Sequence, residues 1–105
     1  MKFRIFNILF IFLFAKNIIA QNIFSGYIIG VDNKKALSNV EIHDFYNGFI
    51  TKSDEKGYFK FTNKASELKL VFYKYEYNYL VTNLNANQEH NIQIEPYNIE
   101  LSEIT

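Results

Sequence analysis

Cysteine is absent from the 105 residues of this chain. Its absence excludes a disulfide framework, thiolate chemistry and a lipid-anchor cysteine. A domain of this size without crosslinks must be stabilised by its hydrophobic core and has little stability to spare. Hydrophobic residues make up 49% of the chain and aromatic residues 18%. The composition therefore supports one small folded domain and argues against a disordered tail.

The chain also lacks a long apolar run: none reaches the length of about 20 residues that a membrane-spanning helix needs. The longest run, residues 5–15, follows two basic residues and precedes a third, and residues 1–20 contain no acidic side chain. A basic start, a short apolar run and a small residue at the cut site are typical of a secretory signal peptide. We predict cleavage after Ala20, so that Gln21 begins an exported mature chain. The alternative is an uncleaved membrane anchor.

The chain also lacks an excess of basic residues. The whole chain has 11 basic and 11 acidic residues. Loss of Lys2, Arg4 and Lys16 with the leader leaves 8 basic against 11 acidic residues, which is a net charge of −3. Proteins that bind nucleic acid usually carry a basic patch, so no nucleic-acid partner is expected. The net charge also provides no attraction to anionic lipid.

The mature part consists of short segments that alternate apolar and polar residues or are rich in β-branched and aromatic residues. Helical periodicity and internal repeats are not found there. Strands are predicted over 23–31, 40–45, 49–51, 58–62, 68–73, 77–81 and 90–95, the last stopped by Pro96. Turns are predicted at 32–35, 46–48 and 53–57, and a polar loop at 83–89. Short strands at this spacing indicate an all-β sandwich or barrel.

Residues that could support chemistry are sparse. Without cysteine, His43 and His90 would need scattered carboxylates to hold zinc, so two surface histidines on strands are expected. Asp54 and Glu55 before Gly57 are similar to a fragment of a calcium loop. Lysines occupy neighbouring positions, which favours a plain turn. No serine lies in a nucleophile-elbow context, and nothing favours a Ser/His/Asp triad. We therefore expect no metal, no cofactor and no enzymatic activity.

Tyrosine recurs at every second position in one segment: Tyr73, Tyr75, Tyr77 and Tyr79. In one continuous strand these side chains would share a face. Such a face, with Tyr73 and Tyr75 as its candidate binding residues, would be able to stack sugars or bases. The simpler alternative is ordinary sheet covering, because tyrosine suits strands and has a polar tip. A turn between Tyr75 and Tyr79 would split the stripe.

Three segments of the mature chain follow one another in a known order. They are Gly-Tyr-Ile-Ile-Gly-Val-Asp, Ala-Leu-Ser-Asn-Val-Glu-Ile and Ser-Asp-Glu-Lys-Gly-Tyr-Phe, at 26–32, 36–42 and 53–59. They resemble the carboxypeptidase-regulatory-like (transthyretin-like) domain of exported Bacteroidetes-type proteins. That family reads roughly G-x-V-x-D, P-L-x-G-V-x-V and T-D-x-x-G-x-F, and its next segment, matched here by residues 70–77, usually ends in Gly-Tyr. This chain departs from the pattern at four positions: Ala36 for Pro, Asn39 for Gly, Ser53 for Thr and Glu76 for Gly.

The resemblance implies a transthyretin-like Greek-key β-sandwich of about seven strands over residues 21–96. Its structural turn motif would consist of Gly26, Asp54, Gly57 and Phe59. The Asp54 side chain can accept hydrogen bonds from backbone N–H groups two residues on, and Gly57 can adopt the left-handed conformation. Phe59 is then expected to point into the core.

Residues 97–105 provide a second resemblance. Leu101-Ser102-Glu103-Ile104-Thr105 is similar to the L-x-E-V-x-V-T segment that follows this domain in TonB-dependent outer-membrane receptors, with Ile104 in place of Val. In those receptors the segment lies near the stretch that contacts TonB. Leu101, Glu103 and Ile104 are therefore a candidate TonB-contact segment.

Together the resemblances imply a non-catalytic N-terminal accessory domain of such a receptor, in the periplasm or outer membrane of a Gram-negative bacterium. TonB or a receptor barrel would be its partner. The many strands that a receptor barrel needs are absent from these 105 residues, so the chain is expected to be a fragment or truncated product. One alternative is a stand-alone exported module that binds carbohydrate or protein. Another is the N-terminal domain of a different exported protein, because similar L-x-E-V endings occur there as well.

Overall fold

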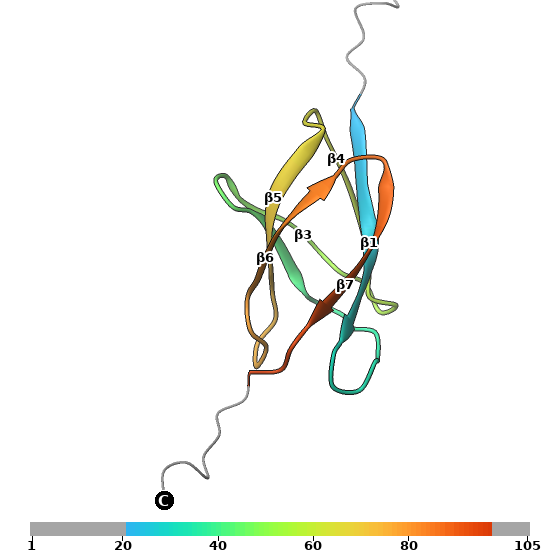
Figure 1. Ribbon diagram of the computed structural model, residues 1–105, viewed down its shortest axis with the longest axis vertical. Helices are drawn as coiled ribbons and strands as arrows, with labels where there is room; N and C mark the ends of the chain where they lie inside the picture. Colours follow the sequence, from blue (N-terminus) through green and yellow to red (C-terminus); the bar gives the residue numbers. More distant parts are fainter. Residues whose placement is uncertain (1–20, 98–105) are drawn as a thin grey trace, which may run out of the picture.

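The computed structural model describes residues 21–97 (Figure 1). The strands are β1 (Asn22–Gly30), β2 (Glu41–Asp44), β3 (Gly48–Lys52), β4 (Tyr58–Asn63), β5 (Glu67–Tyr73), β6 (Leu80–Asn85) and β7 (Gln88–Ile94). Within this part of the chain no helix is long and apolar enough to cross a membrane. The predicted leader, residues 1–20, and the candidate TonB-contact residues Leu101, Glu103 and Ile104 lie outside the described residues.

The seven strands form two sheets that pack as a sandwich. One sheet has the order β4-β1-β7 and the other the order β3-β2-β5-β6. The pair β1 and β7 is parallel, and the other pairs are antiparallel. The expected all-β class, with about seven strands in two sheets, is confirmed.

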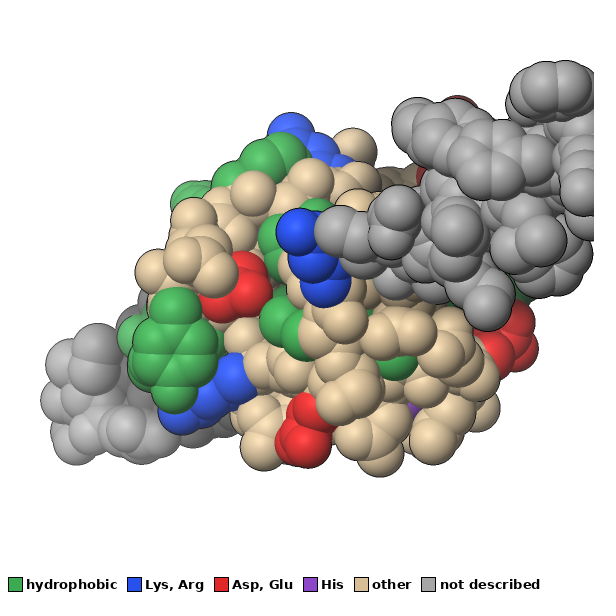
Figure 2. All heavy atoms as spheres, turned by 90° about the horizontal axis from the view of Figure 1, so that it is seen from above, with side chains coloured by type: hydrophobic (Ala, Val, Ile, Leu, Met, Phe, Trp, Pro, Cys, Tyr) green, Lys and Arg blue, Asp and Glu red, His purple; other side chains and the backbone are tan. Residues whose placement is uncertain are grey.

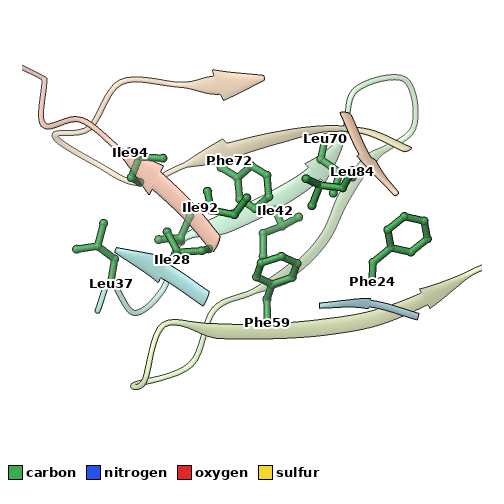
Figure 3. Packing of buried hydrophobic residues seen from close by; sticks show 11 residues of the cluster. Phe24, Ile28, Leu37, Ile42, Phe59, Leu70, Phe72, Leu84, Ile92 and Ile94 are labelled. Carbon is green, nitrogen blue, oxygen red and sulfur yellow. The ribbon is translucent and has the colours of Figure 1, made fainter. Parts of the chain in front are cut away.

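Alternation along the strands places one row of side chains between the sheets. In Figure 3, Ile42 and Phe72 of the four-stranded sheet face Ile28 and Phe59 of the other sheet. The buried hydrophobic residues are Phe24, Ile28, Leu37, Val40, Ile42, Phe59, Leu70, Phe72, Leu84, Ile92 and Ile94. Full burial of one such side chain contributes about 1.5–3 kcal/mol. Each of these core residues lies between positions 24 and 94, so residues 21–97 contain all of them.

The strand bounds after β5 differ from the sequence prediction. The predicted strand at 77–81 and the predicted loop at 83–89 are wrong, because β6 begins at Leu80 and β7 already begins at Gln88. In β6 the Leu84 side chain is buried while its neighbours Asn83 and Asn85 are more exposed. Burial alternates along β6, but polar Thr82 takes a less exposed position and apolar Val81 an exposed one. The residue types therefore do not show the apolar–polar alternation that identifies half-buried strands.

A two-residue turn, Ala86–Asn87, carries the chain from β6 in one sheet to β7 in the other. Asn87 has a φ of 63°, in the left-handed region that asparagine tolerates better than most residues. Its backbone N–H donates to the carbonyl oxygen of Ile23 (2.6 Å), and its side-chain oxygen accepts from the Ile23 N–H (3.0 Å). The polar character that predicted a long loop here therefore belongs to a short turn bonded to β1.

Candidate functional site

The tyrosine-rich segment is not a continuous strand. β5 ends at Tyr73, a turn follows at residues 75–76, and β6 begins at Leu80. The stripe is therefore split, as the alternative interpretation anticipated, and the single-strand interpretation is wrong. The turn folds Tyr79 back onto Tyr73, with ring centroids 4.7 Å apart and ring planes at 23°. Tyr75 projects outward with 77% of its surface exposed.

The segment that leaves β7 lies beside this turn, at the end of the sandwich opposite the start of β1 (Figure 1). The Asn78 N–H donates to the Glu95 carbonyl oxygen (2.8 Å), and the Tyr97 N–H donates to the Glu76 carbonyl oxygen (2.6 Å). An isolated antiparallel bridge joins the strand-like backbones of positions 77 and 96. Residues 95–97 are thereby attached to the tyrosine turn.

The two attached segments form an open groove, which we call the tyrosine groove. Glu76 and Asn78 contribute polar side chains to it. Its aromatic and proline lining consists of Tyr73, Tyr75, Tyr77, Tyr79, Tyr97 and Pro96. The structure thus brings Tyr73 and Tyr75, the candidate binding residues, into one site. Pro96 and Tyr97 had no signal in the sequence, because only tertiary pairing places them there.

Tyr77 anchors the groove to the sandwich. Its side chain packs partly buried against the core, and its hydroxyl lies 3.6 Å from the point where a Cβ on Gly30 would be. Burial raises the pKa of Tyr77 above its ordinary value of 10.0, and the negative charges of Asp32 and Glu76 raise this pKa further. The folded protein therefore makes ionisation of the Tyr77 phenol less favourable.

We expect Tyr77→Phe to reduce the loss of stability above pH 10. The folded state binds the Tyr77 proton more tightly than the unfolded state does, because the folded pKa is the higher one. This contribution is complete below the unfolded pKa of 10.0. It is lost as the pH rises from there through the raised folded pKa. Urea unfolding at neutral and alkaline pH measures the effect, with Tyr46→Phe at an exposed position as control. The same alkaline loss in wild type and Tyr77→Phe would contradict the assignment.

A second exposed surface, the aromatic sheet face, lies on the outer side of the four-stranded sheet. Phe49, His43, Val71 and Val81 stand opposite one another across β3, β2, β5 and β6. Exposed aromatic residues at or beside this row are Phe45, Tyr46, Phe49 and Tyr79. By contrast, the end of the sandwich where β1 begins shows hydrophobic side chains interspersed with charged ones (Figure 2). Sequence reasoning missed the aromatic sheet face because strand register, rather than local sequence, aligns its members.

The Ser53–Gly57 turn is closed by a side chain and a glycine. The Asp54 carboxylate accepts hydrogen bonds from the backbone N–H groups of Lys56 and Tyr58, both at 2.9 Å. Gly57 has a φ of 76°, and its carbonyl oxygen accepts from the Ile28 N–H (2.8 Å). The turn is therefore bonded directly to β1.

Gly26 and Phe59, the other members of the turn motif, meet in the core between β1 and β4, where they are paired in register. Phe59 is 1% exposed. A Cβ on Gly26 would lie 3.1 Å from the Phe59 ring and 2.3 Å from the His90 carbonyl oxygen. Glycine at this position allows β7 and the Phe59 ring to approach β1 closely.

The two histidines lie on different sheets and have separate partners. His43 Nε2 lies 2.9 Å from a Glu41 carboxylate oxygen, and His90 Nε2 lies 2.8 Å from the Asn85 carbonyl oxygen. Within residues 21–97 no three His, Cys, Asp or Glu side chains are grouped so that they could hold a metal ion. The buried Ser53 hydroxyl donates to the Leu37 carbonyl oxygen (2.7 Å).

No protein-family model matches the chain, and no curated protein is significantly similar to it. The fold defines a small all-β domain of two sheets, with an open tyrosine groove at one end. A function must therefore be inferred from the residues of this chain.

Proposed function

We propose that residues 21–96 are a non-catalytic accessory domain of a TonB-dependent outer-membrane receptor, with a transthyretin-like Greek-key fold. The supporting observation is the backbone at Asn39 and Glu76, two positions at which the similar family carries glycine. Their φ angles are 59° and 72°, in the left-handed region that only glycine adopts freely. Both positions thus have a conformation that suits the glycine of the family pattern, although neither retains it.

Ser53 supports the same proposal. It stands where the family pattern has threonine, and a hydroxyl is the group that the two residue types share. That hydroxyl accepts from the Val40 N–H (3.0 Å) and donates to the Leu37 carbonyl oxygen (2.7 Å). It therefore joins the connection before β2 to the end of β3. The departure from threonine keeps the contact that the fold uses.

The accessory role also agrees with how reactive side chains are used. The Ser53 side chain is buried, and its hydroxyl is hydrogen-bonded to two backbone groups. His43 pairs with Glu41, and His90 contacts a carbonyl oxygen. The Ser53 and His90 hydrogen bonds join separate segments, and the His43–Glu41 pair lies within β2. Exposed aromatic side chains are found in the tyrosine groove and on the aromatic sheet face. The domain would then act by contact with partners, and residues 95–97 lead from it toward the candidate TonB-contact segment.

Binding to TonB tests this proposal. Residues 21–105 are titrated with the periplasmic domain of the TonB protein from the same genome, and binding is followed by fluorescence anisotropy. We expect saturable binding that falls by about tenfold or more when Leu101, Glu103 and Ile104 are replaced together by alanine. Tyr46→Ala, far from this segment in sequence, is expected to leave the affinity unchanged. An absence of binding, or equal binding by the triple variant, would count against the receptor role.

A second candidate is a stand-alone exported binding module that acts through the tyrosine groove. The observation that favours it is that Tyr75 (77% exposed) and Tyr97 (59% exposed) lie on neighbouring segments and line the same groove. Aromatic side chains of this kind are enriched at binding surfaces, where they provide large contact areas with little loss of conformational entropy. A ligand site in the tyrosine groove is compatible with either candidate, although a stand-alone module and a receptor domain exclude each other.

A further inference from the structure

We infer that the tyrosine groove binds an extended, proline-rich peptide segment that carries a basic residue. The inference deepens the second candidate function and depends on it. Proline-rich segments adopt the polyproline II helix and dock in grooves lined by aromatic side chains. The tyrosine groove has this composition, with five tyrosines and a proline among its lining residues.

The aromatic side chains of the groove come from two separate segments. The rings of Tyr73 and Tyr79 stack on each other, so these rings cover part of each other's faces. Tyr77 packs toward the core. Tyr75 and Tyr97 come from opposite segments. The exposed rings of Tyr75 and Tyr97 therefore stand on separate segments, and a polyproline II helix can place its rings between separated aromatic side chains.

The groove already contains a proline of the chain itself. Pro96 is the only proline in the sequence, and it lies opposite Tyr77 in an isolated antiparallel bridge. It also lines the groove. One proline of the chain therefore borders the groove opposite Tyr77, and a proline-rich ligand would lie beside it.

The groove also offers hydrogen-bond donors to a proline-rich peptide. A polyproline II helix has no internal hydrogen bonds, so its carbonyl oxygens need donors from the binding surface. Tyrosine hydroxyls and the asparagine amide are donors. The exposed side chains of Tyr75 and Tyr97, together with Asn78, place such donors along the groove.

The charges around the groove predict the basic residue. Glu76 lines the groove, and no basic side chain does so among the described lining residues. Asp32 and Glu76 both act on the Tyr77 phenol, so both negative charges lie near the groove floor. Lys74, the one basic residue within 73–79, donates to the Ser38 carbonyl oxygen (2.8 Å). The local field is therefore negative and complements a cationic ligand.

Titration of ¹⁵N-labelled residues 21–105, which contain every buried core residue named above, tests the inference. The probe is the synthetic peptide Pro-Pro-Lys-Pro-Pro-Lys-Pro-Pro. One comparison peptide has alanine in place of every proline, and another has glutamate in place of lysine. We expect the amide signals of Tyr75, Asn78 and Tyr97 to shift. The lysine peptide should bind several-fold more tightly than the other two.

Three variants assign the contacts. Tyr75→Ala is expected to weaken binding of the lysine peptide about tenfold. Tyr46→Ala is the matched control, because Tyr46 is equally exposed (76%) but lies in the turn between β2 and β3. It should bind as wild type does. Glu76→Gln should reduce the preference for lysine over glutamate peptides, because only Asp32 then remains of the two negative charges, while leaving a proline contribution in place.

Each outcome bears on a different claim. No shift at millimolar lysine peptide, or equal binding of the alanine peptide, would overturn the inference. If a linear oligosaccharide such as cellohexaose shifts the groove signals and the peptide does not, the ligand class is wrong and the binding module stands. If neither probe binds, the second candidate function fails with the inference.

Discussion

Gly57→Val is expected to destabilise the domain by about 2–4 kcal/mol. Two effects act together at this position. Gly57 has a φ of 76°, which costs about 1–3 kcal/mol for a residue other than glycine. A Cβ would also lie 2.5 Å from the Ile28 carbonyl oxygen and 3.2 Å from the Leu37 backbone nitrogen. Because these neighbours are backbone atoms, the turn would have to move away from β1.

Two other glycines separate these effects. Gly48 has a φ of 99°, and nothing lies within 4 Å of the point where its Cβ would be, so Gly48→Ala carries only the conformational cost. Gly26→Ala carries mainly the steric cost, because its Cβ would lie 2.3 Å from the His90 carbonyl oxygen. Urea unfolding of the three variants measures each loss. If Gly57→Val were no less stable than Gly48→Ala, close contact between this turn and β1 would be excluded.

Phe59→Ala is expected to lower the free energy of unfolding by about 3–5 kcal/mol. The Phe59 ring is fully enclosed, and it meets the Phe72 ring of the other sheet edge to face at 5.6 Å. On its other side lies Gly26, which has no side chain to move into the space. The cavity left by truncation would therefore collapse poorly, and poor collapse places the loss toward the upper end of the range.

Phe49→Ala is the matched control for Phe59→Ala. Phe49 is 57% exposed on the aromatic sheet face, so its truncation should cost about 1 kcal/mol or less. Chemical denaturation followed by circular dichroism gives both values. A small domain has about 5–15 kcal/mol in total, so Phe59→Leu serves as a milder variant if the alanine variant does not fold. Equal losses at positions 49 and 59 would contradict the assigned core.

Alternation, together with β-branched and aromatic content and the turn signals, was sufficient to predict the strands up to β5. Leu70 and Phe72 lie two positions apart and are both buried, so the local pattern and the tertiary structure agree there. The pattern failed after Tyr73 because β6 places polar Thr82 at a less exposed position and apolar Val81 at an exposed one. A strand paired along one edge with β5 is determined by its neighbour more than by its own sequence.

The candidate site was predictable in part. Tyr73 and Tyr75 stand out by their spacing, but Tyr97 reaches the groove only because its N–H donates to the Glu76 carbonyl oxygen. Contacts between residues so far apart along the chain leave no local periodicity. Glu76, in contrast, did have a signal in the sequence. The pattern that the sequence resembles has glycine at this position, and the φ of Glu76 is 72°, in the left-handed region that glycine adopts freely.

The parallel pairing of β1 with β7 also has a mechanical consequence. The first and last strands are in register from Phe24 beside Gln88 to Gly30 beside Ile94, and they run in the same direction. The described chain therefore enters at one end of the sandwich and leaves at the other (Figure 1). A pull on its two ends would load the β1–β7 hydrogen bonds in shear, all at once, instead of opening them one after another. Tension transmitted through this domain would meet its most resistant direction.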